Sequence, residues 1–399
     1  MDALKQHAHR ARSRSTWWRT VISVFVGVFA EAAVSSAQNV DSTSWFVRTG
    51  VTSGYILPAN PFMASPDHPG GAIRWGQNLT FEIGRQTDGN EQWHQLYGVP
   101  SYGFGVSVAS FKNDVEHARP VEAYTFFSWP FARLSDRVDL TTDFGMGMSW
   151  HWKEMTDTAA SYETSLGSDL NARINWGFYV RYASTPRITL FTGVDYTHRS
   201  NGGMVQPDRG INVIGPKVAL QYSLAPTEVR RRVVQPPEFH PSWEFIAGGT
   251  GGVKNVIERR EPLTRDNYGS LDATAALQRQ FYRFGKIAIG TDLAYDGATG
   301  VKIDDSDTRW RANPGQRWAL GFYGGYEHII GRFGAIVQVG QNVVRGYDDA
   351  NLPRLYERFG WRYHFNDRYW TTIVIRALEG RRADALQFGI GYRTRLFTK

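Results

Sequence analysis

Residues Val138 to Trp150 read VDLTTDFGMGMSW, and their polarity changes at almost every step. Most residues at even positions are large and apolar, whereas those at odd positions are polar or small. Because residues i and i+2 of a β-strand lie on the same face, the stretch predicts a strand with one apolar and one polar face. Residues 385–396 alternate in the same way. A membrane barrel with its apolar face outward explains both segments, but so does a strand packed on a soluble core, and alternation alone leaves both open.

The first 37 residues have the pattern of a cleavable secretory signal. A basic stretch precedes the apolar segment Thr20 to Ala30, and small residues follow it up to Ala37. This apolar segment is too short to span a bilayer, so we expect cleavage between Ala37 and Gln38.

Composition favours the barrel for residues 38–399. The chain has 41 Gly, 14 Trp and a mean hydropathy of −0.40, and no stretch after Ala37 approaches the roughly 20 apolar residues of a membrane helix. About fourteen to sixteen alternating segments lie between Trp45 and Phe397, separated by turns rich in Gly, Asn, Asp and Pro. We see no Pro/Ser linker dividing the chain. The sequence therefore predicts an all-β fold with one domain, a single transmembrane antiparallel β-barrel of about 14–16 strands in the bacterial outer membrane.

Charge and cysteine content exclude several classes of function. The chain has no cysteine, which excludes a disulfide framework, a thiol nucleophile and a thiolate metal site. Residues 1–37 hold five Lys or Arg and two Asp or Glu, so removing them lowers the net charge from +7 to about +4. This mild, dispersed charge gives no indication of nucleic-acid binding.

Residues 186–224 contain the candidate site. The even positions from Ile188 to Tyr196 form an apolar face, and His198 and Ser200 continue its parity. The next apolar face begins at Asn212, after a turn. In an antiparallel hairpin the start of the second strand lies beside the end of the first, so we expect Asn212 next to His198 on the outer surface.

These residue types suit nucleophilic catalysis. A serine needs a base, which His198 would provide to Ser200, and the amide of Asn212 would orient the imidazole. The Asn201 side chain and the backbone N–H groups of Gly202 and Gly203 are the candidate oxyanion donors. A His-x-Ser pair followed by Asn-Gly-Gly is also ordinary loop chemistry, so this plainer interpretation stays open.

Other charged residues near the site are weaker candidates for a role in catalysis or lipid binding. Parity points Asp195 into the lumen, away from His198, whereas Asp208 lies in the turn and is an alternative to Asn212. The basic residues around the site would meet lipid phosphates if they face outward; they are Arg199, Arg209 and Lys217.

The stretch HRSNGGMVQPDRGIN, residues 198–212, resembles the lipid A 3-O-deacylase family of outer-membrane barrels, including its longer acyloxyacyl hydrolase-like members. Residues 186–224 fit well and most of the mature chain fits loosely, with ADALQFGIGYR resembling the closing strand. The resemblance implies an esterase acting on lipid A or lipopolysaccharide, without a cofactor. It implies Ser200 as nucleophile, His198 as base and Asn201 as an oxyanion contributor.

The third member of the site departs from this pattern. Short lipid A deacylases have Glu where this chain has Asn212, whereas outer-membrane phospholipase A has a His-x-Ser-Asn-Gly motif with Asn as its third member. That second resemblance would imply a phospholipid substrate, calcium and a homodimer. A non-catalytic porin or structural barrel is the remaining alternative.

Overall fold

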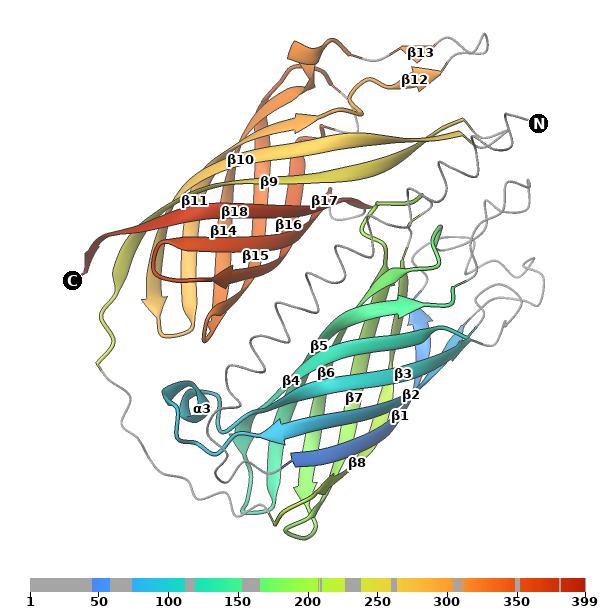
Figure 1. Cartoon of the computed structure of the whole chain (residues 1–399), viewed down its shortest axis with the longest axis vertical. Helices are drawn as coiled ribbons and strands as arrows, with labels where there is room; N and C mark the ends of the chain where they lie inside the picture. Colours follow the sequence, from blue (N-terminus) through green and yellow to red (C-terminus); the bar gives the residue numbers. More distant parts are fainter. Residues whose placement is uncertain are drawn as a thin grey trace. The chain divides into compact units, whose positions relative to one another are not determined.

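The structure is a computed structural model that describes residues 45–57, 74–111, 119–152, 166–206, 208, 210–226, 238–259, 264–303, 309–310, 312–348, 352–379 and 382–398. The predicted secretory signal lies outside these residues. Antiparallel strands dominate the described chain (Figure 1). None of the described helices is long and apolar enough to cross a membrane.

Eight strands form a first closed barrel, here called barrel 1, in which β1 pairs with both β2 and β8. A short helix, α3 (Gln92–Leu96), lies between the second and third strands. The strands are β1 (Trp45–Leu57), β2 (Trp75–Gln86), β3 (Ser101–Phe111), β4 (Val121–Arg133), β5 (Val138–Trp150), β6 (Asn171–Ala183), β7 (Ile188–Ser200) and β8 (Ile211–Ser223).

Eight further strands form a second closed barrel, barrel 2, in which β9 pairs with both β10 and β18. A two-stranded sheet of β12 (Lys302–Ile303) and β13 (Arg309–Trp310) and a 3-10 helix, η2 (Pro314–Arg317), lie between β11 and β14. The barrel strands are β9 (Ser242–Arg259), β10 (Thr264–Tyr282), β11 (Gly285–Asp296), β14 (Trp318–Ile330), β15 (Phe333–Arg345), β16 (Leu355–His364), β17 (Tyr369–Leu378) and β18 (Arg382–Thr398).

The prediction of an all-β fold with closed antiparallel barrel structure is confirmed, but the strands close into two barrels instead of the single barrel that was expected. The strands of the two barrels together fall within the expected range, yet β8 returns to β1 instead of pairing with β9. The segment between them, residues 224–241, contains four prolines, which cannot donate ladder hydrogen bonds. In the sequence, these prolines mark the connection between the two barrels.

The two faces of the strands resolve the ambiguity left by alternation. Large apolar side chains cover the outside, and two of them, Ile289 and Ile390, are 77% and 73% exposed. Charged side chains such as Glu122 and Arg376 are buried inside. A soluble protein rarely exposes so much apolar surface around buried charges, whereas a barrel in hydrocarbon requires this arrangement. The apolar face therefore points outward, as expected for a membrane barrel.

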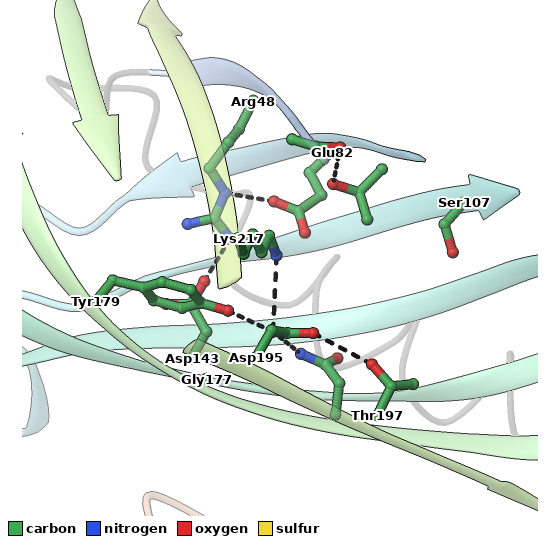
Figure 2. Close-up of polar contacts among 12 residues, drawn as sticks. Arg48, Glu82, Ser107, Asp143, Gly177, Tyr179, Asp195, Thr197 and Lys217 are labelled. Carbon is green, nitrogen blue, oxygen red and sulfur yellow. Dashed lines mark hydrogen bonds and ion pairs between the residues drawn. The ribbon is translucent and has the colours of Figure 1, made fainter. Parts of the chain in front are cut away.

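Ion pairs fill the lumen of barrel 1 (Figure 2). Arg48 pairs with Glu82 and, at 2.8 Å, with Asp143, while Tyr179 donates to Asp195. The inward position of Asp195 was expected from its parity. In barrel 2, the Arg358 guanidinium similarly joins two aspartates, Asp272 at 3.1 Å and Asp292 at 2.6 Å.

The connections at the two ends of barrel 1 differ in length. At one end, four-residue turns, 134–137 and 184–187, join β4 to β5 and β6 to β7, and a longer link, 87–100, which contains α3, joins β2 to β3. At the other end the links are longer, namely 58–74, 112–120, 151–170 and 201–210. We call these the turn end and the loop end. In outer-membrane barrels short turns face the periplasm and long loops face the exterior, which places the loop end at the outer surface.

The Glu122 carboxylate is the centre of one lumen cluster, and its removal should destabilise barrel 1. It accepts hydrogen bonds from Ser107 Oγ at 2.5 Å, Arg173 Nε at 2.8 Å and Arg199 Nε at 2.5 Å. Glu122→Ala leaves two buried guanidinium groups without their anion, so we expect a loss of about 3–5 kcal/mol in the free energy of unfolding. Urea unfolding in lipid vesicles, followed by tryptophan fluorescence, measures this loss. The exposed Gln77→Ala is the control, and a loss below about 1 kcal/mol for Glu122→Ala would contradict the prediction.

Candidate active site

The β7–β8 hairpin brings three predicted site residues together at the loop end of barrel 1. His198 lies directly opposite Asn212 in the antiparallel register. Ser200 follows His198 by two residues at the end of β7, so both side chains leave the strand on the same, outward-facing side. His198 and Asn212 are half-buried and Ser200 is buried.

The three side chains form a continuous hydrogen-bonded chain. Asn212 Oδ1 lies 2.6 Å from His198 Nδ1, and His198 Nε2 lies 3.0 Å from Ser200 Oγ. An amide oxygen can only accept, so this arrangement puts the imidazole proton on Nδ1. The lone pair of Nε2 then faces the Ser200 hydroxyl, which is the tautomer a general base requires.

Tyr196 is a residue of this site that sequence reasoning missed. Its hydroxyl donates to Asn212 Oδ1 at 2.7 Å, so the amide oxygen accepts from both Tyr196 and His198. The sequence did contain a signal, because Tyr196 precedes His198 by two residues and shares its face. The alternation by itself places Tyr196 only on the apolar surface.

The predicted oxyanion donors are already engaged by groups of the loop end. Asn201 Nδ2 donates to Ser168 Oγ at 3.1 Å and to Val205 O at 2.8 Å, which uses both of its hydrogens. The backbone N–H groups of Asn201 and Gly203 donate to Asp208. These donors are therefore not presented to the Ser200 hydroxyl here, because the left-handed turn at Gly202 and Gly203 points their N–H groups at a carboxylate of the same loop.

Asp208, the alternative to Asn212, does not orient the His198 imidazole in this structure. Its carboxylate accepts from the loop backbone, with Oδ1 3.1 Å from Asn201 N and Oδ2 2.8 Å from Gly203 N, whereas Asn212 bonds to His198. Burial raises the pKa of the Asp208 carboxyl to about 6, and the N–H bonds from Gly203, Asn201 and Gly202 oppose this rise. The carboxyl is thus mainly ionised at neutral pH.

Gly210 closes the loop against the imidazole. Its φ of 68° lies in the left-handed region, and an added Cβ would come within 3.0 Å of His198 Cε1. Glycine satisfies both constraints, so the sequence places it where the backbone must pass close to the base.

Two of the three basic residues expected near lipid phosphates point inward instead. Arg199 and Lys217 are 1% and 4% exposed, and they pair with Glu122 and Asp195 in the lumen. Both occupy odd positions of strands whose even positions face outward, so their parity already excludes the outer surface. Arg209 lies outside the described residues.

Barrel 2 does not repeat this arrangement in its described strands. His364 Nε2 lies 2.7 Å from Glu327 Oε1, and His328 Nδ1 lies 3.0 Å from the Tyr326 hydroxyl. Over the described parts of both barrels, no group of three or more His, Asp or Glu gathers as a set of metal ligands.

Two family models match the chain, one over each barrel. The model described as lipid A 3-O-deacylase (PagL) matches residues 78–221, and the model described as acyloxyacyl hydrolase, C-terminal domain (PagL_C), matches residues 241–396. No curated protein sequence matches the chain significantly.

The similar solved structures are distant. The outer membrane enzyme PagL is 17% identical, with 44% of this chain and 98% of that chain covered and a TM-score of 0.28. A mutant of the Rh. blastica porin is 11% identical, with 89% and 99% covered and a TM-score of 0.16. CdiB from Acinetobacter baumannii is 10% identical, with 90% and 61% covered and a TM-score of 0.18. Superpositions this weak carry no argument about function.

Closed antiparallel barrels with apolar outer faces and charged lumens define an outer-membrane β-barrel protein of bacteria. With a deacylase match on barrel 1 and an acyloxyacyl hydrolase match on barrel 2, the chain belongs to the lipid A 3-O-deacylase and acyloxyacyl hydrolase-like family of outer-membrane barrels.

Asn212 should control how fast Ser200 reacts. In Asn212→Ala the imidazole can adopt either tautomer, so we expect labelling of Ser200 by a fluorophosphonate probe to slow by about 10²- to 10⁴-fold. The rate of labelling of the purified protein in detergent measures the effect. An unchanged rate would show that the Asn212–His198 bond does not set the tautomer.

Tyr196→Phe should have a smaller effect on the same rate. It removes one neutral hydrogen bond to Asn212 and leaves the His198 bond in place, so we expect slowing of about 2- to 10-fold. Tyr222→Phe, on the outward face of β8 at the turn end, is the matched control. Equal labelling rates for the two tyrosine variants would show that Tyr196 does not contribute to the reactivity of Ser200.

Proposed function

We propose that this protein is an outer-membrane serine esterase that removes an ester-linked acyl chain from lipid A. The observation that carries the proposal is the chain of hydrogen bonds from Asn212 through His198 to Ser200, which sets the tautomer for base catalysis. The deacylase family match over barrel 1 supports lipid A as the substrate.

The proposed reaction has two halves. His198 Nε2 takes the Ser200 proton as Oγ attacks the ester carbonyl, and the same imidazole returns that proton to the departing sugar or acyl-chain alcohol. The acyl group is then esterified to Ser200. Water, deprotonated by His198, attacks this ester and releases a fatty acid, and the proton goes back to Ser200.

The position of the site suits an outer-leaflet lipid. Ser200 is the last residue of β7, at the loop end that faces the exterior, and exposed apolar residues such as Leu190 and Val194 precede it on the same face. An ester of lipid A lies at the boundary between sugar headgroup and acyl chains. A nucleophile at the rim of the apolar face is at the matching depth.

A neutral amide as third member affects the expected rate. Asn212 fixes the tautomer and orientation of His198, but it supplies no negative charge to the imidazolium that forms when Ser200 gives up its proton. The same amide favours phospholipid hydrolysis as the second candidate function, because outer-membrane phospholipase A also has Asn at this place. Calcium and a homodimer belong to that second candidate.

The test is mass spectrometry of lipid A and phospholipids from membranes that contain the protein or its Ser200→Ala variant. We expect wild-type membranes to contain lipid A lacking one ester-linked acyl chain, and the variant to abolish this loss. Ser223→Ala, a buried serine at the turn end of β8, is the matched control and should behave as wild type.

Two other results would overturn the proposal. Lysophospholipid that depends on Ser200, especially with added calcium, would favour the phospholipase-like function. No Ser200-dependent change in either lipid class would favour a non-catalytic barrel, whose solute conductance is then measured in planar bilayers.

A further inference from the structure

The loop that follows Ser200 wraps around a single carboxylate. Asp208 Oδ1 and Oδ2 accept the backbone N–H groups of Asn201 and Gly203, and the N–H of Gly202 also faces the carboxylate. Gly202 and Gly203 have φ values of 69° and 81°. Successive N–H groups converging from such a turn form a concavity that binds an anion.

Asp208 is itself anchored to the barrel rim. Its backbone pairs with Leu166 in an isolated antiparallel bridge, and its N–H donates to Gln206 Oε1 at 3.3 Å. The Leu166 side chain is buried in an apolar cluster with Ile211 and Val213, the first inward-facing residues of β8. The carboxylate thus joins the residues directly after Ser200 to a packed part of barrel 1.

We propose that Asp208 is a positioning residue whose carboxylate holds the Asn201–Gly203 turn and thereby keeps the Ser200 hydroxyl in line with His198 Nε2. The role rests on the proposed esterase function. The Asp208 carboxylate contacts the backbone of the loop, and it acts through the backbone adjoining the nucleophile.

The chemistry of the two oxygens explains why a carboxylate is suited to this position. An ionised carboxylate accepts hydrogen bonds at both oxygens, whereas an amide presents one acceptor and one donor. In Asp208→Asn the NH₂ group would therefore oppose either the Asn201 or the Gly203 N–H group. The variant keeps the volume of the side chain and loses part of the hold on the turn.

Hydrogen–deuterium exchange tests the hold on the turn without reference to activity. In lipid nanodiscs, we expect the amides of Asn201 and Gly203 to exchange at least tenfold faster in Asp208→Asn than in wild type, while amides of β3 are unchanged. Asp136→Asn, at an exposed carboxylate of the turn end, is the control. Equal exchange of the loop amides in wild type and Asp208→Asn would overturn the proposal.

Steady-state kinetics test the effect on Ser200. For hydrolysis of a short-chain nitrophenyl ester we expect Asp208→Asn to lower kcat by about 10- to 100-fold with little change in KM, because the nucleophile is misplaced while substrate contacts remain. A change in KM alone would overturn the positioning role. If lipid A is the same in wild-type and Ser200→Ala membranes but the exchange result holds, the proposed function fails and the structural hold of Asp208 stands.

The pH profile provides a readout that a purely structural role would not move. The described groups that face the carboxylate are the three backbone N–H groups, and within the described residues no charged side chain pairs with Asp208. Protonation of the Asp208 carboxylate converts one of its oxygens to a hydroxyl, which is a weaker acceptor for the loop N–H groups. Wild-type kcat should therefore decrease when the pH is below about 6, the pKa of Asp208. Protonation of His198 lowers kcat at acidic pH in wild type and in Asp208→Asn alike. The difference between wild type and Asp208→Asn should therefore shrink below that pH, and a constant ratio would contradict the proposal.

Discussion

The closed antiparallel ladder is the constraint on which the rest of the structure depends. Hydrocarbon offers no hydrogen-bond partners, so every backbone N–H and C=O group in the membrane must be paired, and among sheets only one without edges achieves this. Barrel 1 closes through β1 and β8, and barrel 2 through β9 and β18. Closure then fixes an inside and an outside for every strand, with charges such as Glu122 paired in the lumen and apolar side chains facing lipid.

The candidate site is a local exception to this division. On β7 the outward positions from Ile188 to Val194 are apolar except Thr192, but the same face ends in His198 and Ser200. Polar groups on that face are tolerated because they satisfy one another through Asn212 and because they lie at the rim, where water and headgroups begin. The inward residue between them, Arg199, forms an ion pair with Glu122. The lumen network therefore also fixes the part of β7 that carries His198 and Ser200.

The two barrels differ in what they contribute. Barrel 1 holds the Asn212–His198–Ser200 chain, whereas the strand histidines of barrel 2 bond to Glu327 and Tyr326. Both lumens are crossed by ion pairs between strands distant in sequence, such as Arg48 with Asp143 and Arg358 with Asp272. Such pairs hold strands together, and each becomes costly if one partner is lost, since the other remains as an uncompensated buried charge.

The sequence by itself determined the all-β class, which residues of an alternating strand share a face, and the adjacency of His198, Ser200 and Asn212, because the period of two and hairpin pairing are local properties of the chain. Which face points outward was decided by the tertiary structure, through the buried charges and exposed apolar side chains. The alternation of the sequence could not predict that β8 closes on β1, because this closure depends on pairing between residues more than 150 positions apart. The loop hydrogen bonds that occupy Asn201 and Gly203 also required the tertiary structure. They depend on how residues 201–208 fold back over one another, and the backbone N–H groups involved carry no sequence signature.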